Sequence, residues 1–516
     1  MVQTMLILPV LAPSLAALAA AVLGWRRWVA WAAVAASGVV LTMGVAAALA
    51  TADGTVLILA GTLRADALTA VMLLVIGGVS VIATWVGVGY IDRELATGET
   101  TARGARRYQI LVPLFVATMA GAVLASNLGV LWAAVEATTI VTAFLVGHHG
   151  GRRAIEATWK YVIICSVGIA LAYLGTVLVY YASQHAGHAD GSLDWTALVA
   201  RADQLDPGVM RIAVVLLVLG FGTKVGLVPM HSWLPDAHSQ APAPVSALMS
   251  GVLLSVAAYA LLRYRVIAAA ALDPAFLRTL LLVVGIGSVA VAASLMIVQR
   301  DYKRLLAYSS IEHMGLVMIG LAVGTRLAVA ALLLHILGHG LAKAVLFCAS
   351  GEILYEAGTT QIAGVRGLLA RRPVLAGTFV LGIAALLGLP PFSLFASELA
   401  LARAAADEGM IWVVGFALAL LLVVFVAVTR PVAGMLLGSH APVEGPEVHV
   451  RRTRDDGTHD RTHDDGSDGG AVLVATRRPT VPVAPLVAGV AALAAIGVLV
   501  PLDGLLETAA AIVGTR

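Results

Sequence analysis

Residues 218–235 read VLGFGTKVGLVPMHSWLP, an apolar run in which Lys224 is the single charged residue and is followed by Gly226 and Pro229. Gly and Pro both disfavour a continuous helix. An ionisable side chain at membrane depth is unfavourable and marks function by default. Broken helices with an ionisable group beside the break are typical of ion sites in membrane transporters. The stretch therefore predicts a membrane-spanning helix that is broken beside a functional lysine.

The rest of the chain has the composition of a membrane protein. Of its 516 residues, 60% are hydrophobic and 12% are charged, and the mean hydropathy is +0.94. A soluble protein carries about 25% charged residues. We therefore expect an all-α polytopic membrane protein that lies in the lipid bilayer, with no nucleic-acid partner.

Fourteen apolar runs are long enough to cross a hydrocarbon core of about 30 Å. They lie near residues 4–23, 28–50, 68–90, 109–125, 127–148, 158–182, 210–228, 243–262, 278–299, 303–323, 327–350, 373–396, 409–433 and 481–501.

The distribution of Lys and Arg predicts the orientation. Odd-numbered connections between these spans hold 21 basic residues and even-numbered connections hold eight. Cytoplasmic loops carry the excess of positive charge. We expect a bacterial inner (plasma) membrane protein with both termini outside. Residues 437–480 are polar, Gly-rich and mixed in charge, which predicts a flexible cytoplasmic loop. Their Asp/His alternation is more typical of a linker than of a metal site, so we predict no metal site.

Lysine is scarce, and its positions are informative. Only four of the 33 Lys and Arg residues are Lys, and Lys160, Lys224 and Lys343 fall inside predicted spans. Arg keeps its proton under nearly all conditions, whereas a buried Lys can release it. The pattern favours proton-carrying lysines over the alternative, in which they only pair with acids and pack helices.

Other ionisable residues accompany these lysines. His335, His339 and Lys343 recur at every fourth position, which places them on one helix face. The remaining candidates for a proton path are Glu136, His231, His238, Glu312, His313 and Glu398.

A second span is interrupted as well. Residues 385–398 read ALLGLPPFSLFASE, in which Pro390 and Pro391 precede Glu398. Paired interruptions indicate inverted repeats with ion sites at the breaks; the alternative is that both breaks simply kink packed helices. The predicted units are three N-terminal spans (1–108), a first five-helix repeat (109–264), a second (265–436), the polar loop (437–480) and a last span with a short C-terminal segment (481–516).

These repeats would bring the charges into register. Glu136 would correspond to Glu312, Lys160 to Lys343, and Lys224 to Glu398.

The two cysteines, Cys165 and Cys348, both lie in apolar runs. Iron–sulfur clusters need several spaced thiolates. We therefore predict no redox centre and no cofactor in this chain.

Three segments resemble a known family: residues 224–254 (KVGLVPMHSWLPDAHSQAPAPVSALMSGVLL), 305–315 (LLAYSSIEHMG) and 339–347 (HGLAKAVLF). They resemble the antiporter-like subunits of respiratory complex I, multisubunit cation/proton antiporters and group 4 hydrogenases, over roughly residues 60–435. IEHMG and the SE after GLPPF resemble most the hydrogenase-associated F-type subunit. The resemblance implies a fourteen-helix fold with two inverted five-helix repeats, broken helices 7 and 12, and buried charges at mid-membrane.

The resemblance also implies roles for single residues. Glu136 matches the family's fifth-helix glutamate and Lys224 its broken-helix lysine. Lys343, with His335 and His339, matches the connecting eleventh helix, and Glu398 occupies the outlet position.

Two positions depart from the family pattern. Ser255 stands where many members have a lysine, so the connection between the half-channels would rely on water or on His231 and His238. Glu398 is an acid where several relatives carry Lys.

The leading hypothesis is a proton-translocating subunit of an energy-converting redox complex of the hydrogenase or complex I type. Its partners would be other membrane subunits of the same family and a redox module that carries Fe–S clusters and NiFe or flavin centres. The alternative is a sodium/proton antiporter component or an ion-coupled inorganic-carbon uptake module without redox partners. Co-purifying subunits distinguish the two.

Overall fold

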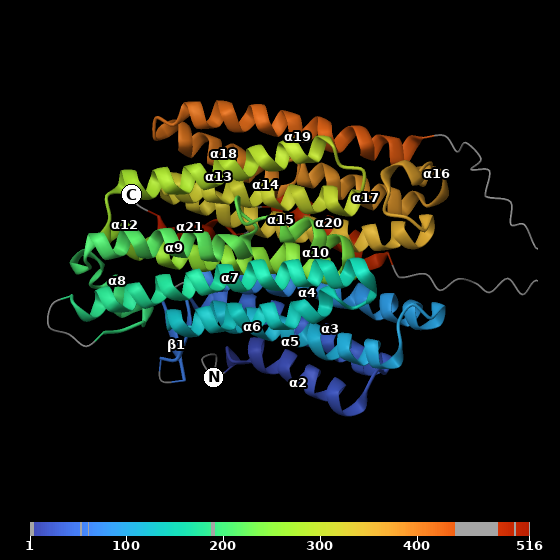
Figure 1. The fold of residues 1–516 in the computed structure, drawn as a ribbon, viewed down its shortest axis with the longest axis horizontal. Helices are drawn as coiled ribbons and strands as arrows, with labels where there is room; N and C mark the ends of the chain where they lie inside the picture. The colour runs from blue at the N-terminus through green and yellow to red at the C-terminus, as the bar shows by residue number, and fades with distance from the viewer. Residues whose placement is uncertain are drawn as a thin grey trace, which may run out of the picture.

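The computed structural model describes residues 5–51, 54–59, 61–186, 191–438, 483–499 and 502–514. Helices run side by side along the long axis of the molecule (Figure 1). A small antiparallel sheet pairs β1 (Val56–Ile58) with β2 (Leu63–Ala65). The predicted all-α class is confirmed. Most of the predicted loop 437–480 lies outside the described residues, so the structure does not test it.

The described helices have the following bounds. They are α2 (Leu8–Leu23), α3 (Arg27–Ala50), α4 (Ala67–Thr97), α5 (Ala102–Leu124), α6 (Leu128–Val146), α7 (Gly151–Gln184), α8 (Trp195–Val199), η1 (Ala202–Gln204), α9 (Pro207–Val225), α10 (Trp233–Gln240), α11 (Ala243–Leu248), η2 (Met249–Leu253), α12 (Leu254–Ala271), α13 (Pro274–Ile297), α14 (Tyr302–Val323), α15 (Arg326–Ala357), η3 (Ile362–Gly364), α16 (Leu368–Arg371), α17 (Pro373–Leu386), α18 (Ser393–Asp407), α19 (Ile411–Leu437), α20 (Ala484–Leu499) and α21 (Asp503–Val513).

Many of these helices fit a membrane. Among the described residues, eleven helices are long and apolar enough to cross a bilayer, with α11, η2 and α12 counted as one. Three shorter apolar helices, α2, α17 and α20, lie among them.

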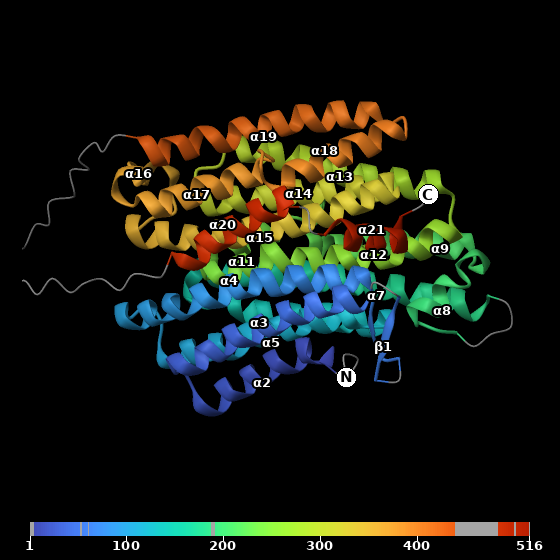
Figure 2. The same ribbon diagram turned by 180° about the vertical axis from the view of Figure 1, so that it is seen from behind.

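The interior of the bundle is formed by α14, α15 and the α11–η2–α12 rod. Their apolar stretches are almost entirely buried, whereas only 17% of the apolar stretch of α19 is buried. In Figures 1 and 2, α19 and α2 lie on opposite flanks with α15 between them. The ionisable residues in the middle of α14 and α15 (Glu312, His313, His335, His339 and Lys343) are therefore buried within protein.

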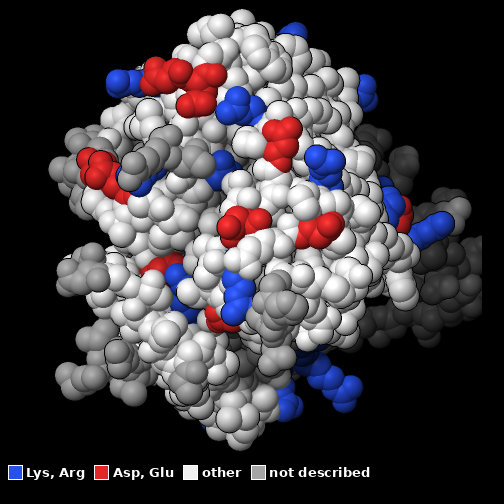
Figure 3. All heavy atoms as spheres, turned by 90° about the vertical axis from the view of Figure 1, so that its left-hand side faces the viewer, with Lys and Arg blue, Asp and Glu red and all other residues white. Residues whose placement is uncertain are grey.

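The bundle has two ends. We name them after the even- and odd-numbered connections between the predicted spans. The even end holds the connections α5–α6, α12–α13 and α18–α19, and the odd end holds α4–α5, α6–α7 and α15–α16. Figure 3 looks onto the even end, where side chains of both charges are dispersed over a mostly uncharged surface. Charge at this end is therefore not gathered into a patch of one sign in this view.

Both predicted interruptions are present as breaks between helices. Helix α9 ends at Val225, Gly226 has a positive φ of 84°, and α10 begins only at Trp233. A left-handed conformation at this position favours glycine. The Thr223 carbonyl accepts from the Gly226 N–H at 3.2 Å and from the Trp233 indole at 2.8 Å, so the indole ties the start of α10 to the end of α9. Pro229 lies within this break.

The second break separates α17 from α18 and contains Pro390 and Pro391. Gly388 has a φ of 60°, and a Cβ at this position would collide with the carboxylate of Glu398. The glycine therefore allows both the turn and the close approach of the acid.

A π-helical turn, η2, interrupts the rod between α11 and α12. Such turns occur frequently at functional sites because they change the direction of neighbouring side chains. Its residues carry no Pro, and the sequence did not lead us to expect it.

A buried ion pair joins two helices at the even end. Asp66 caps α4 and accepts two hydrogen bonds from the Arg263 guanidinium of α12, at 2.7 and 2.8 Å. Arg64 donates a further bond at 3.1 Å. Burial by itself raises the pKa of Asp66, but Arg263 and Arg64 outweigh it and hold the pKa well below its usual range. The carboxylate is therefore charged at any working pH.

We expect Asp66→Ala to destabilise the protein strongly. Removal of one partner of a buried pair leaves the Arg263 charge uncompensated, at a cost of about 3–5 kcal/mol. Asp206→Ala is the matched control because Asp206 caps α9 at an exposed position, where loss of a cap costs about 1 kcal/mol. Thermal unfolding in detergent measures both. Equal melting temperatures for the two variants would contradict the structural role of the Asp66–Arg263 pair.

Candidate functional site

Lys224 lies at the centre of a buried polar group in the first broken helix. Its ammonium donates to the hydroxyl of Thr139 and to the hydroxyl of Tyr161, the latter at 3.4 Å. Thr139 in turn donates to Glu136 Oε2 at 2.8 Å. We call Glu136, Thr139, Thr142, Tyr161 and Lys224 the Lys224 cluster. Glu136 and Lys224 are therefore linked through one hydroxyl.

Local sequence explains this arrangement. Glu136 and Thr139 are three residues apart on α6 and so share one helix face. Lys224 lies in the last turn of α9, where the helix dipole favours a positive charge. Tyr161 packs its ring 5.0 Å from Trp233 and hydrogen-bonds Thr142. The lysine is thus surrounded by hydroxyl groups that can both donate and accept a proton.

Lys160 does not join this group. The sequence placed it inside a membrane span among the buried lysines, and the structure corrects this placement. Its side chain is 46% exposed and forms ion pairs with Glu156 at 2.8 Å and Asp236 at 3.0 Å. The three residues line a polar cavity of about 380 Å³ at the odd end. The reason is the length of α7, whose 34 residues extend about 51 Å and exceed the hydrocarbon core.

Lys343 lies at the centre of a second polar group, on α15. Its ammonium donates to the Leu306 carbonyl at 2.6 Å and to the hydroxyl of Ser309, both on α14. Lys343 is fully buried. Like Lys224, it is held by neutral acceptors.

Histidines continue from Lys343 along α15 and α14. His313 Nδ1 lies 3.0 Å from His335 Nε2, and His335 Nδ1 lies 3.0 Å from the Ser397 hydroxyl. The His339 ring centroid is 5.1 Å from that of His313, and Glu312 Oε2 is 3.4 Å from His313 Nε2. The predicted stripe on α15 is thus extended by α14 and α18. We call these residues, with Lys343 and Ser309, the histidine cluster.

Glu398 closes the series at the second break. It is half-buried and lines a mostly apolar cavity of about 300 Å³. Donor atoms of Glu398, His313 and His335 all lie within 4.8 Å of one another. The position is close enough to the histidine cluster to exchange a proton with it.

The region between the Lys224 and histidine clusters contains His238. The His238 ring stacks on the Phe347 ring, with the two centroids 4.9 Å apart. Lys343 Nζ lies 6.0 Å from the centroid of the Phe347 ring. Ser255 hydrogen-bonds its own helix at the Gly251 carbonyl, 3.1 Å away. The hydroxyls of Ser250, in η2, and Ser310 bond each other at 2.8 Å. His231 lies half-buried within the first break.

Several buried polar atoms here have no protein partner among the described residues. They are Glu312 Oε1, His231 Nδ1 and both ring nitrogens of His238 and His339. Buried polar groups are normally satisfied, and internal water is the usual partner when no protein atom serves. The arrangement suits a hydrated proton path.

Sequence reasoning missed the hydroxyl groups that connect the charges. Thr139 lies three residues after Glu136, and Ser309 lies three residues before Glu312. The i,i+3 spacing of a hydroxyl and an acid inside an apolar span was a signal that could have indicated them.

Comparison with known proteins matches this chain to a described family. The pattern described as "NADH:quinone oxidoreductase/Mrp antiporter, TM" matches residues 125–424. A hydrogenase-4 component F homolog from Methylacidiphilum infernorum is 40% identical over 60% of this chain and 65% of its own length. An NADH-quinone oxidoreductase subunit N from Desulforudis audaxviator is 34% identical over 61% of each chain. The chain thus spans less than two thirds of these relatives, and the predicted resemblance is confirmed.

Solved structures share the fold over nearly the whole chain. A chain of the Mrp complex from Dietzia sp. has a TM-score of 0.81 at 23% identity, covering 99% of this chain and 97% of that one. A chain of respiratory complex I from Thermus thermophilus has a TM-score of 0.75 at 22% identity and full coverage of both. At these identities the likeness shows the fold alone.

The exposed position of Lys160 is testable by cysteine labelling. In a chain whose two native cysteines are replaced by Ser, Lys160→Cys should react readily with a charged maleimide. Lys343→Cys should react more slowly by about two orders of magnitude, because a buried site reacts only after an opening that costs about 3 kcal/mol. Similar rates for the two variants would contradict the placement of Lys160 at the surface.

Proposed function

Because the chain belongs to the NADH:quinone oxidoreductase/Mrp antiporter membrane family, we propose that it translocates protons as one membrane subunit of an energy-converting redox complex of the hydrogenase or complex I type. One observation carries the proposal. Lys224 is fully buried and, among the described residues, is hydrogen-bonded to Glu136 through one intervening hydroxyl, that of Thr139.

The chemistry of this link explains why it suits proton transfer. A carboxylate in direct contact would hold the lysine charged, and a lysine with no acid nearby would stay neutral. With one hydroxyl between them, Glu136 can favour the charged form of Lys224 without fixing the lysine in that form. Lys224 can then take up a proton and pass it on when the charge of its surroundings changes.

The histidine cluster supplies the second half of the proposed path. A proton from the Lys224 cluster would reach Lys343 through the region of His238, with water bonded to the free ring nitrogens. It would pass along His339, His313 and His335. Glu398 would release it into the cavity that it lines. His231 lies at the first break. Glu312 would contribute a carboxylate beside His313, and Lys160 would contribute a positive charge to the polar cavity at the odd end.

We further propose that fourteen segments cross the membrane. The eleven long helices and the three shorter ones, α2, α17 and α20, supply them. Helices α9 and α10 would together form the seventh span, and α17 and α18 the twelfth. The two breaks support inverted repeats over residues 109–264 and 265–436, between N-terminal spans (1–108) and a C-terminal unit (481–516).

The complex would supply what this chain does not. We propose that redox centres sit on partner chains, and that other membrane subunits of the same family lie beside this one. The relative at 40% identity, named hydrogenase-4 component F homolog, supports the hydrogenase type. Native mass spectrometry of the detergent-extracted complex tests this: Fe–S and NiFe subunits support it, and a complex without redox subunits contradicts it.

The proton-carrier role of Lys224 is tested by substitution in the assembled complex. Lys224→Ala and Glu136→Gln should each reduce proton pumping at least tenfold. Lys224→Arg should be nearly as harmful as Ala, because Arg keeps the charge but does not release its proton. Pumping is measured as acidification of inverted vesicles.

A buried lysine outside the path provides the matched control. Lys303 donates to the backbone carbonyls of Ser239 and Ala241, which a guanidinium can also satisfy. Lys303→Arg should therefore pump normally. Normal pumping by assembled Lys224→Arg complexes would show that Lys224 carries no proton.

The basic-residue bias leads us to propose that the odd end faces the cytoplasm of a bacterial inner membrane. A cysteine placed at residue 460 should then react with an impermeant maleimide only in inverted vesicles. A cysteine at Asp206, at the even end, should react only in right-side-out cells. The reverse pattern would invert the proposed orientation.

A further inference from the structure

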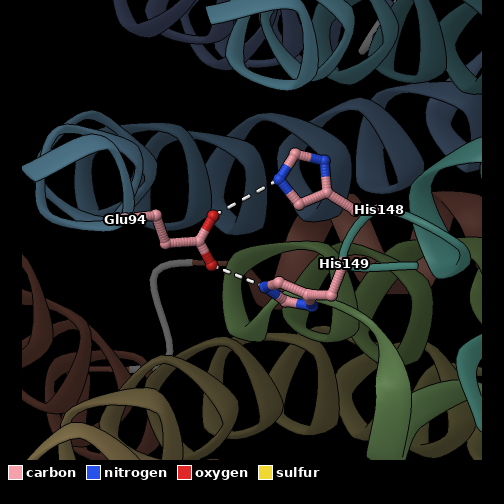
Figure 4. A group of neighbouring side chains, drawn as sticks. All are labelled: Glu94, His148 and His149. Carbon is pink, nitrogen blue, oxygen red and sulfur yellow. Dashed lines mark hydrogen bonds and ion pairs between the residues drawn. The ribbon is translucent and has the colours of Figure 1, made fainter. Parts of the chain in front are cut away.

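A group of three donor side chains lies at the odd end, outside the proposed proton path. Glu94 comes from the last turns of α4, and His148 and His149 come from the connection between α6 and α7. Figure 4 shows both imidazole rings directed at the one carboxylate. His149 Nε2 lies 2.6 Å from Glu94 Oε1, and His148 Nε2 lies 3.3 Å from Glu94 Oε2. We call this group the Glu94 site.

The Glu94 site is enclosed on most sides and open on one. The side chains of Glu94 and His148 are 4% and 1% exposed, whereas that of His149 is 30% exposed. The site is therefore preformed within protein and accessible from the aqueous end of the bundle through His149.

The hydrogen bonds of His149 leave a conflict that a cation resolves. Its Nε2 faces a carboxylate oxygen and its Nδ1 faces the Gln240 carbonyl at 3.4 Å. A neutral imidazole has one N–H and can serve only one of these acceptors. An imidazolium with a proton on each nitrogen satisfies both acceptors, and so does a metal ion on Nε2 with the Nδ1 proton directed at Gln240. A backbone carbonyl is a common second partner of a metal-bound histidine.

His148 presents a similar nitrogen to the same place. Its Nε2 faces Glu94 Oε2 and lies 3.4 Å from the Thr100 hydroxyl. Its Nδ1 is buried and has no hydrogen-bond partner among the described residues. The ring is held edge-on to Tyr108 at 5.7 Å. Packing therefore orients Nε2 toward the carboxylate without tying it to another strong acceptor.

We propose that Glu94, His148 and His149 bind a divalent transition-metal ion of the zinc class. One donor atom from each residue lies within 4.8 Å of the other two. Ligands at 2.0–2.2 Å on a tetrahedral ion lie about 3.3–3.6 Å apart. The Glu94–His148 distance already fits, and His149 would retreat by less than about 1 Å at its exposed side.

The donor set also selects the kind of ion. Two imidazoles and a carboxylate, with a fourth position open to water, suit Zn²⁺ and similar ions. Mg²⁺ and Ca²⁺ prefer oxygen ligands throughout. The ion would tie α4 to the α6–α7 connection and, through Gln240, to α10 after the first break. This proposal does not depend on proton translocation.

Zinc binding is measured on the full-length chain in detergent by equilibrium dialysis. In all samples His440, His449, His459 and His463 are replaced by Gln, because these residues of the 437–480 segment offer other ligands. We expect about one Zn²⁺ per chain. His148→Gln and His149→Gln should each weaken binding at least about tenfold, and binding should be lost below about pH 6 as the imidazoles take up protons.

Two variants serve as controls for the site. His185 is exposed and bonds only the nearby Tyr181 carbonyl among the described residues, so His185→Gln should leave zinc affinity unchanged. His335→Gln tests the other donor group of the bundle and should also leave it unchanged. Bound Co²⁺ should show visible d–d absorption. The His149→Gln variant should fold, because this position is partly exposed, and should lose that absorption.

Each remaining outcome rejects the proposal. Binding that survives in both His148→Gln and His149→Gln places the ion elsewhere. Loss of binding in His335→Gln alone assigns it to the mid-membrane group. No stoichiometric binding at neutral pH means that the Glu94 site is an imidazolium–carboxylate cluster.

Discussion

The lysines at the centre of this bundle are buried without a carboxylate in direct contact. Among the described residues, Lys224 is held by the hydroxyls of Thr139 and Tyr161, and Lys343 by the hydroxyl of Ser309 and a backbone carbonyl. Removing an ammonium from water is costly unless it is well partnered. Hydroxyls reduce that cost without fixing the charge, which leaves the proton free to move.

At the two ends of the bundle, buried charges are held by direct ion pairs instead of by neutral hydroxyls. At the even end, Asp66 and Arg263 form a two-bond ion pair. At the odd end, Arg93 of α4 donates two bonds to Glu352 of α15, at 2.8 and 2.6 Å. Arg does not lose its proton, so both pairs are permanent. Helix α4 is thus anchored at both ends by fixed charges, whereas Lys224 and Lys343 have no such ion pair among the described residues.

Breaks and turns supply the polar atoms that continuous helices would hide. The break after α9 leaves Lys224 in the last turn of that helix, and the break before α18 lets Glu398 approach Gly388. The π-helical turn η2 brings Ser250 to Ser310, the residue next to Ser309 of the histidine cluster. A rigid apolar bundle thereby contains a line of polar groups near its middle.

Composition and local pattern determined the all-α membrane class, the two breaks, the buried lysines and the histidine stripe. These features depend on residues close together in the chain: apolar runs, Gly and Pro at Gly226 and Pro390, and the four-residue spacing on α15. The position of Lys160 depended instead on how far α7 extends beyond the apolar core. The hydroxyl of Thr139 between Glu136 and Lys224, and the meeting of Glu94 with His148, depend on which helix faces pack together. Packing joins segments more than fifty residues apart, and only the tertiary structure could decide it.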